Sequence, residues 1–208
     1  MYYTLSKRIS NRLINKGVIS SDEEEVCTYG LFMLFSHISL FIVTLIFGLI
    51  LKRPLESILF YIQFQVIRRY GGGYHASVEW RCNVLSALSM FACVWLTKMI
   101  DINKTLIALL IISAISAGMI VWLCPVDTKE KPLSETEYQR FRRITIVVLL
   151  FYIAAIVILT VLGQKYWIIP SCLSIILESI LLVAGKVKNS IIARKMDKNR
   201  ASAFEVNN

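Results

Sequence analysis

Long apolar stretches alternate with short polar ones along most of this 208-residue chain. Residues 30–51, 105–124 and 144–162 contain no Asp, Glu, Lys or Arg, and each is long enough to cross a bilayer as a helix. Three further segments, at 54–67, 83–97 and 167–184, are apolar but shorter or interrupted by polar residues. We therefore expect an all-α polytopic membrane protein with about six transmembrane helices, of which the segment at 54–67 is the least clearly apolar.

The N-terminal segment has a different pattern. Leu5, Ile9 and Leu13 recur at helical spacing opposite a basic and polar face, which is typical of a helix lying on an anionic membrane surface. We expect one integral membrane domain over residues 1–208, with an amphipathic interfacial helix at 1–19. Residues 186–208 are expected to form a cytoplasmic tail in which the last helix continues before fraying.

Composition and charge support this picture. The chain is 56% hydrophobic, with a mean hydropathy of +0.63, and this excludes an ordinary soluble domain. With six crossings and an internal N-terminus, 18 of the 23 basic residues fall on the inner side of the membrane. The positive-inside rule then places both termini and residues 68–82 in the cytoplasm. The same distribution explains the net charge of +9 by contact with anionic lipid, so we expect no nucleic-acid partner.

The segment RRYGGGYHASVEWRC, residues 68–82, carries the most distinctive chemistry. His75 and Cys82 supply the imidazole and thiol that cysteine nucleophilic catalysis needs. In a straight helix they would lie about 10.5 Å apart along the axis, too far for a hydrogen bond. We therefore expect the helix to break between Gly71 and Arg81, or the pair to close when substrate binds. A buried structural cysteine and an interfacial histidine are the alternative.

Other polar features are less specific. Residues 68–82 form a first polar island between apolar segments, and residues 124–143 form a second one that carries five basic residues. The second polar island is expected on the same side as His75, where it could attract an acidic peptide or serve topology alone. Within the apolar segments, Glu178 is a candidate for a buried polar contact and Glu56 for a helix-end group reaching the interface. His75, Cys82 and Cys124 lack the close spacing of a metal site, so we expect no metal and no cofactor.

These motifs resemble the accessory gene regulator B (AgrB) family of bacterial membrane peptidases. The resemblance rests on RRYGGGYHA with a cysteine seven residues after its histidine, and on PVDTKEKPL between two predicted spans. It implies a cysteine endopeptidase of the bacterial cell membrane that cleaves the C-terminal tail of an AgrD-like quorum-sensing propeptide through a thioester. It also implies that the enzyme promotes cyclisation of the product to a thiolactone or lactone.

The resemblance assigns roles to individual residues. Cys82 matches the nucleophile and His75 the general base, while Arg68, Gly72 and Gly73 match the preceding motif, where they would bind substrate or shape the site. We expect four basic residues to attract the acidic propeptide tail, namely Arg68, Arg69, Lys129 and Lys131. The competing functional classes are a peptide exporter or transporter and a non-catalytic membrane scaffold. A homodimer is expected, because marginal spans benefit from protein neighbours.

Overall fold

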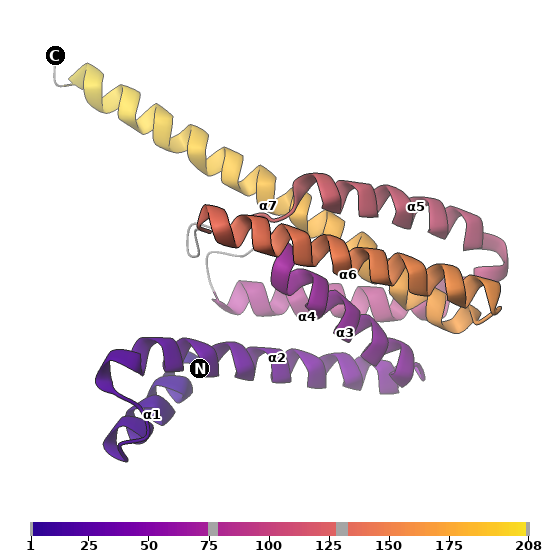
Figure 1. Ribbon diagram of the computed structural model, residues 1–208, viewed down its shortest axis with the longest axis horizontal. Helices are drawn as coiled ribbons and strands as arrows, with labels where there is room; N and C mark the ends of the chain where they lie inside the picture. The colour runs from indigo at the N-terminus through magenta and orange to yellow at the C-terminus, as the bar shows by residue number, and fades with distance from the viewer. Residues whose placement is uncertain (1, 75–78, 128–132, 207–208) are drawn as a thin grey trace.

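The computed structural model describes residues 2–74, 79–127 and 133–206, and this part of the chain is almost entirely helical. It contains no β-strand, apart from an isolated bridge between Gly72 and Val126. The elements, in chain order, are α1 (Tyr2–Asn15), the short 3-10 helix η1 (Ser21–Glu23), α2 (Glu24–Ile50), α3 (Pro54–Gly71), α4 (Glu79–Met99), α5 (Ile102–Leu123), α6 (Glu135–Val161) and α7 (Lys165–Val206) (Figure 1). The all-α prediction is confirmed.

Five described segments are long and apolar enough to cross a membrane: Ser21–Ile50, Arg81–Met99, Ile102–Leu123, Glu135–Val161 and Tyr166–Ile192. They correspond to five of the six predicted spans, so the prediction of a polytopic membrane protein is confirmed. The sixth predicted span, at 54–67, forms most of α3, which has 18 residues but is not among these apolar helices. At 1.5 Å per residue α3 is about 27 Å long, close to the hydrocarbon thickness.

The polarity of α3 reflects its place inside the bundle. Phe60, Phe64 and Ile67 are buried in the core. Gln63 is buried too, and its Nε2 donates a hydrogen bond of 3.1 Å to Oγ of Ser171 on α7. Because α3 faces protein as well as lipid, a polar side chain can find a partner there, and the hydropathy of its sequence is correspondingly low.

The ends of α3 show that it runs the length of the bundle. At its start, Arg53 lies 5.6 Å from the ring of Tyr166 on α7 and shares a pocket with the connection between α4 and α5. At its other end, Gly71 and Gly72 contact Val126, which follows α5. The helix therefore connects the same two ends of the bundle as α5, as six crossings require.

Helix α7 is the central helix of the bundle. It packs mainly against α3 and α5, and its membrane segment is the most deeply buried of the five. Its buried apolar residues are Ile168, Ile169, Cys172, Leu173, Ile175 and Leu182. Beyond the bundle, α7 continues as one helix to Val206, so the predicted tail is helical over that range (Figure 1).

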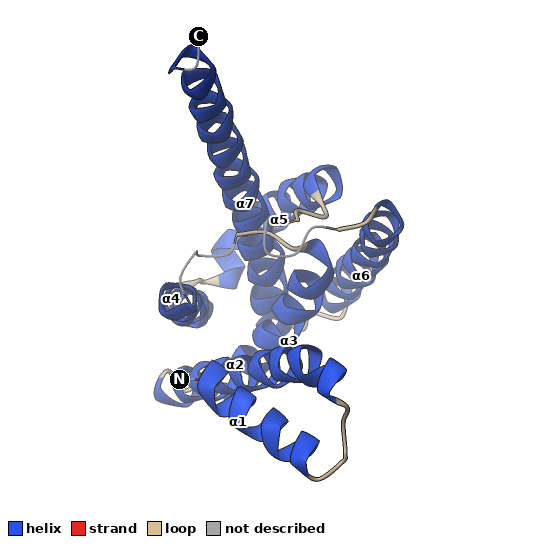
Figure 2. Cartoon of the chain, turned by 90° about the vertical axis from the view of Figure 1, so that its left-hand side faces the viewer, coloured by secondary structure: helices blue, strands red, loops and turns tan. Residues whose placement is uncertain are grey.

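Helix α1 lies against α2, at the edge of the molecule away from α5 and α6 (Figure 2). Two small residues, Ser6 and Ser10, are buried, and Oγ of Ser10 donates to the carbonyl of Glu24 at 3.2 Å. Leu5 stays 46% exposed, so part of the predicted apolar stripe is not covered by the protein. The amphipathic helix is confirmed as a helix, while its position on the membrane surface stays a prediction.

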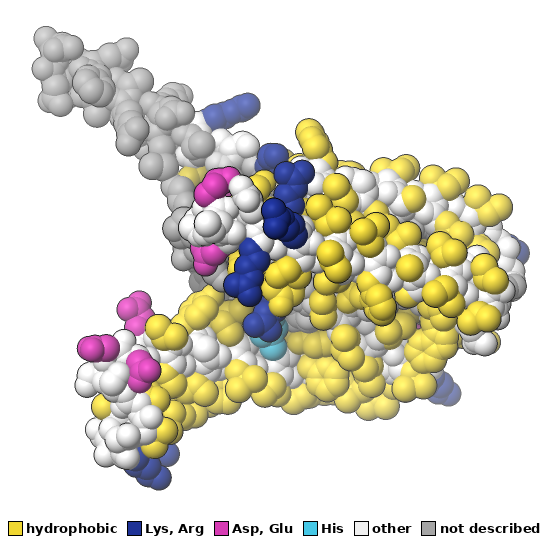
Figure 3. All heavy atoms as spheres, viewed as in Figure 1, with side chains coloured by type: hydrophobic (Ala, Val, Ile, Leu, Met, Phe, Trp, Pro, Cys, Tyr) yellow, Lys and Arg dark blue, Asp and Glu magenta, His cyan; other side chains and the backbone are white. Residues whose placement is uncertain are grey.

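The surface separates apolar and basic regions. Hydrophobic side chains cover most of the visible bundle, and a band of Lys and Arg borders them on one side (Figure 3). Exposed basic residues near the corresponding helix ends are Arg69, Arg140, Arg142, Arg143 and Lys186. This is the arrangement expected of a membrane protein with one strongly basic face. That this face is cytoplasmic stays a prediction.

Candidate functional site

The helical path breaks immediately after α3. Gly72 has a φ of 76° and Gly73 a φ of 114°, backbone conformations that residues with a side chain rarely adopt. The amide of Gly72 still bonds to the carbonyl of Arg68 at 3.2 Å, but the chain then leaves the helix through Gly73 and Tyr74, and the next described residue is Glu79 of α4. The helical path is therefore interrupted at residues 72–74, within the predicted range between Gly71 and Arg81. Residues 75–78 lie outside the described residues, so a break between His75 and Cys82 stays a prediction.

Backbone hydrogen bonds tie this glycine turn to the second polar island. The amide of Val126 donates to the carbonyl of Gly71 at 2.9 Å, and the amide of Gly73 donates to the carbonyl of Val126 at 3.2 Å. These two bonds form the isolated bridge, in which the two segments run parallel. Residues 71–73 and 126 therefore meet although more than fifty positions separate them, and the two islands that the sequence placed on one side form one structure.

Helix α7 supplies the other support of the glycine turn. The amide of Tyr74 donates to the carbonyl of Leu181 at 2.9 Å. One turn further along α7, a Cβ on Gly185 would lie only 2.7 Å from the carbonyl carbon of Gly73. Asn189 extends the same face and donates from Nδ2 to the carbonyl of Asp127 at 2.8 Å. Residues 181–189 of α7 thus hold both polar islands.

The Arg68 side chain bonds to backbone carbonyls of the glycine turn. Its guanidinium donates to the carbonyl of Gly72 at 2.6 Å and to the carbonyl of Tyr74, and its Nη1 lies 4.0 Å from Oε2 of Glu178. These contacts support the shaping role that the sequence left open for Arg68, Gly72 and Gly73. Substrate binding by these three residues stays a prediction. Arg69, by contrast, is exposed and can meet a ligand.

Cys82 lies in the first turn of α4, where it is partly exposed. The neighbouring Arg81, Asn83 and Val84 are exposed, and the first buried residue in the described part of α4 is Met90. The described first half of this helix therefore contributes no residue to the buried core. The Cys82 thiol is therefore accessible from outside the protein, unlike a thiol in the interior of the bundle.

The other four cysteines differ from Cys82 in exposure or in position. Cys93, Cys124 and Cys172 are buried, and Cys27 in the first turn of α2 is the other partly exposed thiol. A nucleophile must reach its substrate, so burial disfavours the three interior thiols. Exposure therefore leaves Cys27 and Cys82 as candidate nucleophiles. Of these two, Cys82 is favoured because a histidine partner, His75, is predicted for it.

Three predicted site residues, His75, Lys129 and Lys131, lie outside the described residues. The pairing of His75 with Cys82 and the binding of an acidic tail by the two lysines therefore stay predictions. The structure does describe the turn that leads directly into His75, the thiol at the start of α4, and residues 124–127 at the start of the second polar island.

The prediction of a buried polar contact at Glu178 is confirmed, since this residue is fully buried beside Arg68. Sequence reasoning did not identify Arg68 as its partner, because the pairing depends on how α3 packs against α7. Sequence reasoning also missed Val126, Leu181 and Gly185. Val126 and Leu181 act through backbone atoms and Gly185 through its missing side chain, so their residue types carried no chemical signal.

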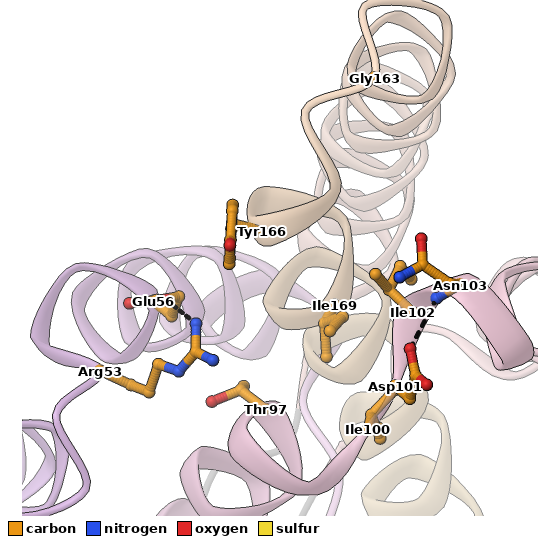
Figure 4. Close-up of a pocket in the computed structure, with 10 residues that line it drawn as sticks. All are labelled: Arg53, Glu56, Thr97, Ile100, Asp101, Ile102, Asn103, Gly163, Tyr166 and Ile169. Atoms are coloured by element: carbon orange, nitrogen blue, oxygen red, sulfur yellow. Dashed lines mark hydrogen bonds and ion pairs between the residues drawn. The ribbon is translucent and has the colours of Figure 1, made fainter.

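A pocket of about 300 Å³ lies at the opposite end of the bundle (Figure 4). Its charged groups are paired locally: Arg53 bonds to Glu56 at 2.9 Å, and Asp101 accepts from the amide of Asn103 at 3.1 Å. The Arg53 contact fits the expectation that Glu56 is a helix-end group. No cysteine or histidine is among the residues that line this pocket, so it does not offer the chemistry predicted for His75 and Cys82.

Comparison with known proteins covers most of the chain. The family model for accessory gene regulator B matches residues 6–182. An AgrB-like protein of Clostridium perfringens strain SM101 is 27% identical over 159 residues, which cover 74% of each chain. The accessory gene regulator protein B of Staphylococcus intermedius is 30% identical over 118 residues, covering 56% of this chain and 62% of the relative. Protein FsrB of Enterococcus faecalis is 23% identical over 199 residues, covering 87% and 82%. No solved structure matches the chain.

Proposed function

Because this chain belongs to the accessory gene regulator B family, we propose that it is a membrane cysteine endopeptidase that cleaves the C-terminal tail of an AgrD-like propeptide. The family is part of the accessory gene regulator quorum-sensing system, which gives peptide processing its setting. The observation that carries the proposal is the partly exposed thiol of Cys82 in the first turn of α4, which follows the glycine turn that leads into His75.

The proposed first step is acyl transfer to Cys82. His75 takes the thiol proton, and the thiolate attacks the carbonyl carbon of the scissile peptide bond. A carbon–sulfur bond forms, the carbon–nitrogen bond breaks, and the tail leaves as an amine that receives the proton from His75. The upstream part of the propeptide stays attached as a thioester.

The proposed second step closes the ring. A thiol or hydroxyl within the bound peptide attacks the thioester carbonyl, its proton passes through His75, and the Cys82 thiolate is released as leaving group. The product is a cyclic thiolactone or lactone and the enzyme returns to its starting state. Water attacking the same thioester would give a linear peptide, so a site that excludes water favours cyclisation.

Substrate recognition in this proposal relies on the basic face of the membrane domain. Arg69 is exposed at the end of α3, and Lys129 and Lys131 belong to the second polar island, whose Val126 bonds to the glycine turn. An acidic propeptide tail at this interface would be attracted by all three charges, whereas Arg68 is occupied inside the protein. We place this face in the cytoplasm, where the propeptide is made.

The test uses purified protein in nanodiscs with a synthetic propeptide. Cys82→Ala should abolish tail release and the thioester-linked species seen by mass spectrometry, because no other group is proposed to carry the acyl chain. Cys27→Ala is the matched control, since Cys27 is also partly exposed and in the first turn of a helix. Retained cleavage in Cys82→Ala, or a loss limited to Cys27→Ala, would contradict the proposal.

A further inference from the structure

Glu178 is a fully buried carboxylate within α7. Neither of its oxygens has a hydrogen-bond partner in the described part of the chain, and Arg68 is its ion-pair partner at 4.0 Å. A buried carboxylate without hydrogen bonds is costly in an apolar interior. The bundle therefore keeps an expensive group at a position where an apolar side chain would pack without that cost.

The position of Glu178 connects it with the glycine turn. A Cβ on Gly71 would lie 2.9 Å from Oε1 of Glu178, so the carboxylate lies directly against the last residue of α3. Leu181, which accepts the hydrogen bond of Tyr74, follows three positions later on α7. Glu178 is therefore beneath the turn, on the helix that supports it.

Arg68 connects Glu178 to the backbone of the glycine turn. Its guanidinium donates to two different carbonyls, those of Gly72 and Tyr74, on either side of Gly73. The planar guanidinium presents its donors in a fixed fork that suits two carbonyls at once, whereas a lysine ammonium is a compact charge on a flexible stem. Since Tyr74 directly precedes His75 in the chain, a contact that fixes the Tyr74 carbonyl acts on the peptide group that joins these two residues.

We propose that Glu178 is a positioning residue of the peptidase site: its buried carboxyl group, 4.0 Å from the Arg68 guanidinium, keeps that side chain against the carbonyls of Gly72 and Tyr74, and thereby orients the peptide group that leads into His75. This inference rests on the proposed peptidase function. It assigns Glu178 no contact with substrate, and it explains why a carboxylate is kept inside the bundle.

A purely structural role makes a different prediction. Replacing both members of a buried ion pair by apolar residues is often neutral or stabilising, whereas removing one member leaves an uncompensated charge. If the pair served stability alone, an apolar replacement of both residues would restore folding and activity together. If the pair positions the turn, the same replacement restores folding but leaves cleavage slow, because the two carbonyls have lost their donor.

The experiment compares three variants in nanodiscs: Glu178→Gln, Arg68→Lys, and the double variant Arg68→Met with Glu178→Leu. Each is measured for thermal stability and for kcat and KM on a synthetic propeptide. We expect kcat to fall about tenfold or more in all three while KM stays within about twofold, and the double variant to melt at or above the wild-type temperature. Glu56→Gln, which breaks the Arg53 pair at the other end of α3, is the control and should keep wild-type kinetics.

Two results would overturn the inference: wild-type kcat in Glu178→Gln, or wild-type kcat in the apolar double variant. Should Glu178→Gln fail to fold, Arg68→Lys decides, because it keeps the charge opposite Glu178 but not the fork, and a wild-type kcat there would also refute the role. Cys82→Ala is measured beside them. Cleavage by Cys82→Ala would refute the peptidase function itself, whereas inactive Cys82→Ala with fully active Glu178→Gln would refute only the positioning role.

Discussion

Gly185 offers a sharp test of whether α7 sets the position of the proposed site. In Gly185→Ala the new methyl group would lie 2.7 Å from the carbonyl carbon of Gly73 and 2.8 Å from the amide nitrogen of Tyr74. Ordinary van der Waals contact begins at 3.4 Å, so the turn or α7 has to retreat by roughly 0.7 Å. The obstructing atoms belong to the backbone, and no side chain can rotate to relieve the contact.

The expected cost follows from this displacement. Overpacking of this kind costs about 1–3 kcal/mol of stability. Weakening the hydrogen bond between the Tyr74 amide and the Leu181 carbonyl would add roughly 1 kcal/mol. For catalysis, a misplacement near 1 Å costs on the order of 100-fold, so we expect kcat to fall about tenfold to 100-fold with little change in KM.

The assay is single-turnover cleavage of a synthetic propeptide in nanodiscs, with thermal melting of the same samples. Gly118→Ala is the matched control, because Gly118 is also within a helix, α5, and a Cβ there would meet no atom within 4 Å. Both substitutions raise helix propensity by about 1 kcal/mol, so that effect cancels. A folded Gly185→Ala protein that cleaves at the wild-type rate would refute the argument that α7 positions the turn.

Three further predictions concern topology, recognition and assembly. A thiol introduced at Lys104 should react with a membrane-impermeant reagent from outside the cell while Cys82 does not, and the reverse pattern would invert the topology. Arg69→Glu or Lys129→Glu should slow processing of an acidic-tailed propeptide, and basic substitutions in that tail should partly restore it; added salt should reduce the effect. If reversal leaves cleavage intact, these charges serve topology alone. Mass measurement in nanodiscs should give a homodimer, and a monomer alone would contradict that expectation.

The apolar helices could be predicted from the sequence because lipid imposes a composition on them. The segments at 30–51, 105–124 and 144–162 face hydrocarbon over much of their length, so their side chains had to be apolar whatever their neighbours. The break after α3 was equally readable, because the positive φ angles at Gly72 and Gly73 favour glycine on local steric grounds. In both cases the constraint acts on a segment by itself.

The segment at 54–67 was harder to interpret, for the opposite reason. Gln63 weakens the hydropathy signal, yet in the structure its amide bonds to Ser171 inside the bundle. Whether a polar side chain in a helix marks a loop or an interior crossing depends on the partner it finds. That partner is more than a hundred positions away, on α7.

The chemistry of the candidate site was indicated by the sequence, and its construction was decided by the tertiary structure. A histidine and a cysteine seven positions apart suggest a reaction through their side-chain types alone. The contacts that shape the turn come instead from the Val126 and Leu181 backbones and from the close approach of Gly185. Backbone groups are the same in every residue except for the missing amide hydrogen of proline, so only the packing of α3, α5 and α7 could determine which of them meet.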